Sequence, residues 1–205
     1  MICDFGVGLS LSSPTRVISR FSHVLVASWA NDPFDGIVQP YALRAPEIYL
    51  RIPWGSAIDI WSMGCLSFEL VSNRWLFIPS ASERWSRDDD HLAQMIEVVG
   101  GAPMPSDVLA RGAHTSKYFD QSGMLCQFLL LIVHGHLIYI GNLLRISKLN
   151  PSSLQKMVTL KSHMQPEDDP ESFVDLISRM LRLRPEDREP AAKLVEHPWL
   201  QASVQ

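Results

Sequence analysis

The segment from Ala57 to Val71 constrains the fold most, because it is apolar almost all round. Its large apolar side chains are Ile58, Ile60, Trp61, Met63, Leu66, Phe68, Leu70 and Val71. A helix without a polar face is contacted on several sides, so we predict a helix in the middle of a core. We expect Ser56 to cap its first turn, where the helix dipole also favours Asp59. Gly64 would allow another element to approach closely.

A stiff loop precedes this helix. Residues 39–47 read Gln-Pro-Tyr-Ala-Leu-Arg-Ala-Pro-Glu. The prolines push the residues before them, Gln39 and Ala45, toward extended geometry, so we predict a non-helical loop. Glu47 closes it, just ahead of three apolar residues. A carboxylate buried there would need a cation from elsewhere in the chain, because an unpaired buried charge is strongly destabilising. The alternative is a proline-rich surface turn with a solvated Glu47.

Composition is that of an ordinary globular protein. The chain has 205 residues, 46% of them apolar and 20% charged, which is enough for one good-sized core. A net charge of −4 gives no electrostatic footprint for nucleic acid or an anionic membrane. Cys3, Cys65 and Cys126 are widely spaced and odd in number, which fits reduced thiols in a cytoplasmic or nuclear protein. The N-terminus has no basic region followed by an apolar one, so no secretion signal is predicted.

Two further segments have the periodicity of helices packed on one face. Leu92, Met95, Ile96 and Val99 form a stripe that follows three aspartates, residues 88–90, and ends at Gly100. We interpret the aspartates as a negatively charged helix cap, and a metal site is the alternative. A later helix opens at Glu171 and Ser172, and its apolar face comprises Phe173, Leu176, Ile177, Met180 and Leu181.

The remaining stretches are less regular. Residues 1–3 suggest a buried strand end that delivers Asp4 into a loop, and residues 7–38 suggest a long irregular segment. Residues 101–165 are expected to be loops and turns, and residues 191–197 a short helix that Pro198 stops. The fold class predicted is therefore mainly α.

Residues 121–144 carry no formal charge. The stretch is long enough for a membrane span of ~20 residues. His134, His136 and several glycines oppose that interpretation, as does the lack of flanking aromatic and basic belts. We therefore predict no span. His134 and His136 alone lack the further ligands that a metal site needs.

The ordered motifs of the chain resemble the C-terminal lobe of a eukaryotic protein kinase. Asp4-Phe5-Gly6 matches the Asp-Phe-Gly motif, and Ala45-Pro46-Glu47 matches the Ala-Pro-Glu motif that closes the activation segment. Residues 59–64 match the pattern of the large helix that follows, and residues 185–188 and 197–200 match the closing segment. Arg44 and residues 90–97 and 144–149 look most like the SR-protein kinases, which are serine/threonine kinases of the group that contains the cyclin-dependent kinases.

This resemblance implies a partial kinase domain over residues 1–200 and a role for ATP and Mg²⁺ in the intact kinase. Asp4 would hold the Mg²⁺ that bridges the ATP phosphates, and Phe5 and Gly6 would complete that cofactor-binding motif. Residues 39–44 would face the substrate position next to the phosphoacceptor. The implied partner is a protein substrate, possibly rich in Arg and Ser.

Three other residues would have supporting roles by the same resemblance. Glu47 would find its cation in Arg188, in a buried pair that ties the activation segment to the lobe. Asp59 would accept hydrogen bonds from the backbone of the catalytic loop.

The sequence also departs from the family. It contains no match to the glycine-rich loop, the strand lysine with its glutamate partner, or the His-Arg-Asp…Asn catalytic loop. The catalytic base is thus absent from the chain, and we expect an incomplete phosphoryl-transfer site. Residues 7–26 and 124–142 fit the family poorly, and we hypothesise that both are retained introns. Two functions follow: a serine/threonine kinase fragment inactive alone, or a non-catalytic, pseudokinase-like interaction protein.

Overall fold

The computed structural model describes residues 2–3, 27–28, 37–99, 104–120, 142–161 and 169–202. This part of the chain is mainly helical, as the sequence predicted. In chain order the elements are β1 (Ile2–Cys3), β2 (Ala27–Ser28), η1 (Tyr41–Leu43), α1 (Pro46–Leu50), α2 (Ala57–Ser72), α3 (Arg87–Val98), α4 (Ser106–Arg111), α5 (Thr115–Tyr118), α6 (Leu154–Lys161), α7 (Pro170–Met180), η4 (Pro185–Asp187), α8 (Ala191–Leu194) and α9 (Pro198–Ala202).

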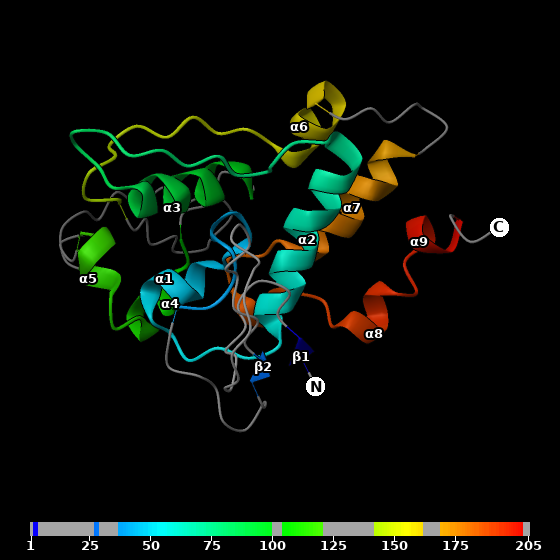
Figure 1. Ribbon diagram of the computed structural model, residues 1–205, viewed down its shortest axis with the longest axis horizontal. Helices are drawn as coiled ribbons and strands as arrows, with labels where there is room; N and C mark the ends of the chain where they lie inside the picture. The colour runs from blue at the N-terminus through cyan, green and yellow to red at the C-terminus, as the bar shows by residue number, and fades with distance from the viewer. Residues whose placement is uncertain are drawn as a thin grey trace, which may run out of the picture.

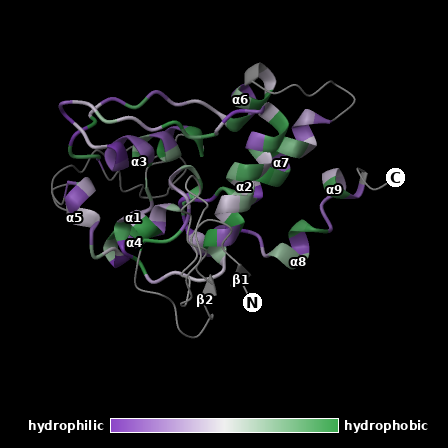
Figure 2. Ribbon diagram, viewed as in Figure 1, coloured by the Kyte–Doolittle hydropathy of each residue, from purple (hydrophilic) through white to green (hydrophobic). Residues whose placement is uncertain are grey.

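Helix α2 stands in the middle of the molecule, with α7 alongside it and α6 above both (Figure 1). It contacts α6, α7, η1 and η4, and hydrophobic residues line α2 and α7 where the two helices meet (Figure 2). Trp61, Cys65 and Phe68 of α2 are buried. The prediction of a helix contacted on several sides is confirmed, while Met63 and Leu70 are 51% and 76% exposed. One narrow face of α2 reaches solvent.

The start of α2 differs from the prediction that Ser56 caps it. Ser56 has helical backbone angles, φ −58° and ψ −18°, and its side chain makes no capping bond. A capping residue needs extended angles to direct its hydroxyl at the free amides of the first turn. The helix starts instead from a backbone turn, in which Gly55 and Ser56 carbonyls accept from the Ile58 and Asp59 amides.

The aspartates predicted to cap α3 lie in its first turn, but the capping residue is Ser86. The Ser86 hydroxyl accepts from the Asp89 amide, and the Asp89 carboxylate accepts from the Ser86 amide, which forms a capping box. Helix α7 begins at Pro170, close to the predicted start, but its cap is Asp169, whose carboxylate accepts from the Ser172 amide at 3.1 Å.

The expectation of loops and turns over 101–165 is wrong for α4, α5 and α6. Helix α1 was likewise not predicted, and helix α8 ends three residues earlier than predicted. These helices have four to eight residues, which is too short to show an amphipathic period. Helices this short depend on tertiary packing, which local sequence does not reveal.

Strand β1 lies within residues 1–3, where a strand end was predicted, and pairs antiparallel with β2 through Ile2–Ser28 and Cys3–Ala27. Asp4, Phe5, Gly6, all of the doubtful insert 7–26, and 124–141 of the other insert lie outside the described residues. In the part of the chain described, no helix combines the length and apolar character needed to cross a membrane.

Replacing Gly64 should destabilise the protein. A Cβ at this position of α2 would lie 2.9 Å from Leu181 Cγ and 3.0 Å from Met180 Cβ, closer than packed carbons tolerate. We expect Gly64→Ala to lower the free energy of unfolding by about 1–3 kcal/mol, measured by chemical denaturation. A Cβ at Gly55 would meet nothing within 4 Å, so Gly55→Ala is the matched control. Equal stability of Gly64→Ala and wild type would contradict the close packing of α2 on α7.

Candidate functional site

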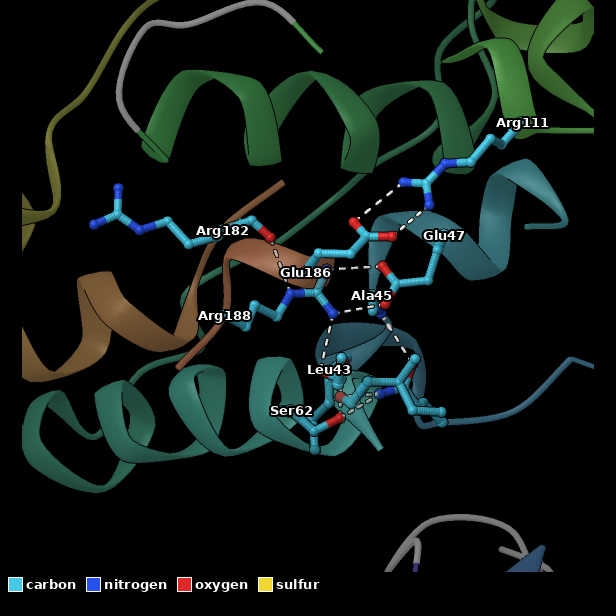
Figure 3. A network of polar contacts seen from close by, with 11 residues as sticks. Leu43, Ala45, Glu47, Ser62, Arg111, Arg182, Glu186 and Arg188 are labelled. Atoms are coloured by element: carbon cyan, nitrogen blue, oxygen red, sulfur yellow. Dashed lines mark hydrogen bonds and ion pairs between the residues drawn. The ribbon is translucent and has the colours of Figure 1, made fainter. Parts of the chain in front are cut away.

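Glu47 and Arg188 form a buried ion pair that joins positions 141 residues apart (Figure 3). Arg188 Nη1 lies 2.6 Å from Glu47 Oε1, and Nη2 lies 2.8 Å from Oε2. The side chains are 0% and 1% exposed. The two parallel bonds match the fork of the guanidinium to the carboxylate, which gives the pair its fixed geometry. Glu47 is therefore paired and buried, and the alternative of a solvated turn residue is wrong.

The rest of the Arg188 guanidinium is also used. Nη1 donates to the Ala57 carbonyl at 2.9 Å, and Nε donates to the Arg182 carbonyl at 2.9 Å. The guanidinium carbon lies 5.1 Å from the centre of the Trp61 ring, within the range of a cation–π contact. One side chain thus connects helix α1, the start of α2 and the chain ahead of η4.

Gln39 holds the loop in front of α1 against α2. Its Nε2 donates to the Ile58 carbonyl at 2.7 Å and to Ser62 Oγ at 2.6 Å, and its Oε1 accepts from the Ala45 amide at 2.9 Å. Gln39 has φ of 68°, so the prediction of extended geometry there is wrong. The hydrogen bonds of the buried Gln39 side-chain amide stabilise a backbone conformation that the following proline disfavours. Ala45 is extended as predicted.

Arg44 folds back onto the same loop. Its Nε donates to the Val38 carbonyl at 3.2 Å and its Nη2 to the Gln39 carbonyl at 3.1 Å. The loop contains one 3-10 turn, η1, where the sequence predicted no helix. Its turn is closed by the Leu43 amide, which donates to the Pro40 carbonyl. Arg44 and Gln39 together hold residues 38–45 in one conformation.

A cluster of aromatic rings lies beside the loop. The rings of Tyr41 and His91 stack with centroids 5.4 Å apart, and Tyr49 Oη lies 2.7 Å from His91 Nδ1. The guanidinium of Arg87 lies 4.1 Å from the Tyr41 ring centroid. Burial raises the pKa of Tyr41 and of Tyr49, so both hydroxyls stay protonated. Burial, together with Arg44 and Arg87, lowers the pKa of His91 to about 3.

Helix α4 makes ion pairs at the surface with η4 and with the residue just before it. Arg111 makes a two-bonded contact with Glu186 of η4, as Figure 3 shows, and Arg184 Nε donates to Asp107 at 2.9 Å. Behind α4, the His114 amide donates to the Leu50 carbonyl at 3.0 Å. Bonds to the arginines lower the pKa of Asp107 and of Glu186.

The other residues singled out from the sequence are placed as follows. Asp59 is half-buried in the first turn of α2. Asp4, Phe5 and Gly6 lie outside the described residues, so their proposed cofactor role stays a prediction. The described residues contain no group of three or more His, Cys, Asp or Glu that could hold a metal ion. Of the aspartates 88–90, Asp89 belongs to the capping box of α3, and Asp88 and Asp90 lie beside it in the first turn of the helix.

Sequence reasoning missed Gln39 and His91. His91 stands four residues before Met95 on the apolar stripe of α3, and that spacing could have marked it as buried. No comparable signal exists for Gln39, because its partners come from α2 and from the far side of the loop.

The protein kinase domain model matches residues 1–200. The chain belongs to the protein kinase domain family. Serine/threonine-protein kinase SKY1 of Saccharomyces cerevisiae is 33% identical over 205 residues, which are all of this chain and 25% of that protein. Serine/threonine-protein kinase SRPK of Physarum polycephalum is 30% identical over 183 residues, 89% of this chain and 38% of that protein.

SRSF protein kinase 3 of Homo sapiens is 29% identical over 174 residues, 85% of this chain and 27% of that protein. The relatives are serine/threonine kinases of the SR-protein kinase type, as the resemblance predicted. The chain spans about a quarter to two-fifths of the length of these relatives.

Removing one partner of the buried pair should be strongly destabilising. Arg188→Met would leave the Glu47 carboxylate buried and unpaired, and we expect the free energy of unfolding to fall by about 3–5 kcal/mol in a denaturant titration. Adding Glu47→Leu should recover most of that loss, because no uncompensated charge remains. Arg182→Met is the control, since Arg182 is exposed and contributes its main-chain carbonyl to the network. A double variant no more stable than Arg188→Met would contradict this account.

His91 should make stability fall as the pH is lowered. Its pKa is about 3 in the folded state and ordinarily 6.5, so between these values the unfolded chain binds the proton more readily. The contribution is fully present above pH 6.5 and is lost as pH falls, by about 1.4 kcal/mol per pH unit. Comparing unfolding at pH 7.5 and 5.5, His91→Asn should lose this part of the dependence, whereas replacing the exposed His114 should not. An unchanged slope in His91→Asn would contradict the assignment.

Proposed function

We propose that this chain is the activation-segment end and helical body of a serine/threonine protein kinase lobe. Residues 39–47 end the activation segment, and residues 39–44 face the residue beside the phosphoacceptor. The observation that carries this proposal is the two-bonded, fully buried pair between Glu47 and Arg188. It joins the two motifs whose order in the sequence first suggested a kinase lobe.

The geometry of the loop supports a role in holding a peptide. A surface that positions a substrate gains rate from being fixed before the substrate arrives, because less ordering is needed on binding. The Gln39 side chain bonds to α2 and to the Ala45 amide, and Arg44 bonds to two carbonyls of the loop. Both residues therefore keep residues 38–45 in place without a ligand.

Protein kinases use ATP and Mg²⁺, and we assign the Mg²⁺ contact in this chain to Asp4 as a proposal. A carboxylate is the ligand type that Mg²⁺ takes beside nucleotide phosphates, so Asp4 fits the ion chemically. Phe5 and Gly6 belong to the same motif. The proposed kinase domain covers residues 1–200, with residues 7–26 and 124–142 as inserts.

The proposed substrate is a protein with serine beside arginine. One relative is named SRSF protein kinase 3, and this chain shares 29% of its residues with it over 174 positions. A titration of the labelled chain with a short arginine–serine peptide tests this point by NMR. The amides of residues 41–44 should shift, while an otherwise identical alanine–serine peptide should leave them unchanged. Equal shifts with both peptides would contradict the substrate class.

The second candidate function is a non-catalytic interaction protein built on a kinase lobe. The observation in its favour is that residues 1–205 contain no match to the His-Arg-Asp…Asn motif. The genomic sequence upstream of Met1 separates the two candidates. An in-frame catalytic loop and strand lysine would favour the kinase, and their absence would favour the interaction protein.

The purified chain should not transfer phosphate on its own. Catalysis of phosphoryl transfer requires a positioned base, a phosphate-binding lysine and two held Mg²⁺ ions, and the sequence supplies a match to one Mg²⁺ ligand, Asp4. We expect the release of labelled phosphate from ATP with Mg²⁺ to equal that of a blank without protein. Turnover above the blank that Asp4→Ala abolishes would overturn the prediction.

A further inference from the structure

Asp88, in the first turn of α3, contacts two separate parts of the molecule through its two carboxylate oxygens. Tyr41 Oη donates to Oδ1 at 2.9 Å, and Tyr118 Oη donates to Oδ2 at 3.2 Å. Tyr41 belongs to the loop of residues 39–44, and Tyr118 ends helix α5. A single carboxylate therefore bridges two hydroxyls that stand 77 residues apart in the chain.

On the loop side, the ring of Tyr41 is fixed by α3. His91 stacks against it at 5.4 Å, and the Arg87 guanidinium lies 4.1 Å from its centre. Tyr41 also closes a backbone turn of the loop, because its carbonyl accepts from the Arg44 amide. A change in the position of the Tyr41 ring is thus transmitted to the backbone of residues 41–44.

On the other side, Tyr118 is 2% exposed and belongs to a small hydrogen-bonded edge, which we define as residues 115–120 and 142–145. The Tyr118 carbonyl accepts from the Leu144 amide at 2.8 Å, and the Asp120 amide donates to the Asn142 carbonyl at 3.0 Å. Arg145 Nη1 joins this edge to α3 by bonding both the Lys117 carbonyl and Asp89.

The neighbouring aspartates have different partners. Asp89 is buried in the capping box and paired with Arg145 at 2.8 Å, and Asp90 accepts from the Ser80 amide and from Gln94. Neither contacts Tyr41 or Tyr118 in the described residues. Asp88 is the aspartate of this triplet that joins the loop to the edge.

We propose that Asp88 is a positioning residue that couples the loop of residues 39–44 to the edge of residues 115–120 and 142–145. A displacement at the edge moves the Tyr118 hydroxyl, releases one oxygen of Asp88 and loosens the Tyr41 anchor of the loop. Coupling between two sites is reciprocal, so loosening the loop also loosens the edge. Its consequence for substrate geometry rests on the proposed function, whereas the coupling itself does not.

Hydrogen exchange of the full chain tests the coupling directly. Tyr118→Phe removes one hydroxyl and keeps the ring, so it should raise the exchange rates of the Leu43 and Arg44 amides about fivefold, measured relative to the amides of α2. Tyr41→Phe should do the same to the Phe119 and Leu144 amides. Both effects should vanish in an Asp88→Ala background, which has no side-chain acceptor and therefore lacks the bridge.

Thr115→Val is the matched control, because it removes a hydroxyl bond in the same edge, from Thr115 Oγ1 to the Leu109 carbonyl at 2.6 Å, without touching Asp88. It should alter exchange near residues 109–115 and leave Leu43 and Arg44 unchanged. The proposal is overturned if Tyr118→Phe has a purely local effect, if Thr115→Val loosens the loop equally, or if the effect persists with Asp88→Ala. No substrate or nucleotide is used, so the proposed function can fail without affecting this result.

Discussion

The Glu47–Arg188 pair is the interaction on which the rest of the described structure depends. Both charges are removed from water, and their stability relies on every remaining polar atom being bonded. Arg188 meets that condition through the Arg182 and Ala57 carbonyls as well as Glu47. A slipped α1 or a shifted η4 would leave a charge buried and unpaired. The pair therefore restricts the packing to one register, whatever its net contribution to stability.

The loop of residues 39–44 inherits its order from this pair in two steps. Glu47 fixes α1, and α1 fixes the end of the loop at Ala45, whose amide donates to Gln39. Gln39 then fixes the beginning of the loop against Ile58 and Ser62 of α2. The two steps form one continuous set of hydrogen bonds. The loop is thus held between helices α1 and α2.

The sequence predicted the helices that are long enough to show a hydrophobic period and the segments that carry a family motif. The continuous apolar pattern located α2, and apolar stripes at helical spacing located α3 and α7. The resemblance in the order of motifs assigned Arg188 as the partner of Glu47. The sequence could not locate the short helices or the role of Gln39. Their cause is tertiary: Gln39 keeps a φ of 68° because α2 supplies acceptors for its amide. The failure at Ser56 has a local origin instead, since Ser56 belongs to a backbone turn that begins at Gly55.

Two kinds of ionic contact surround the site, and they differ in what they can do. The Glu47–Arg188 pair is fully buried, so salt screens it little, and breaking it leaves a charge in an apolar surrounding. The Arg111–Glu186 and Arg184–Asp107 pairs of α4 are 38–55% exposed, and each is worth about 0–1 kcal/mol and weakens with salt. Salt should therefore weaken the ionic contacts of α4 while the buried pair stays intact. Helix α4 keeps its place through apolar packing, because Val108 is fully buried in the core.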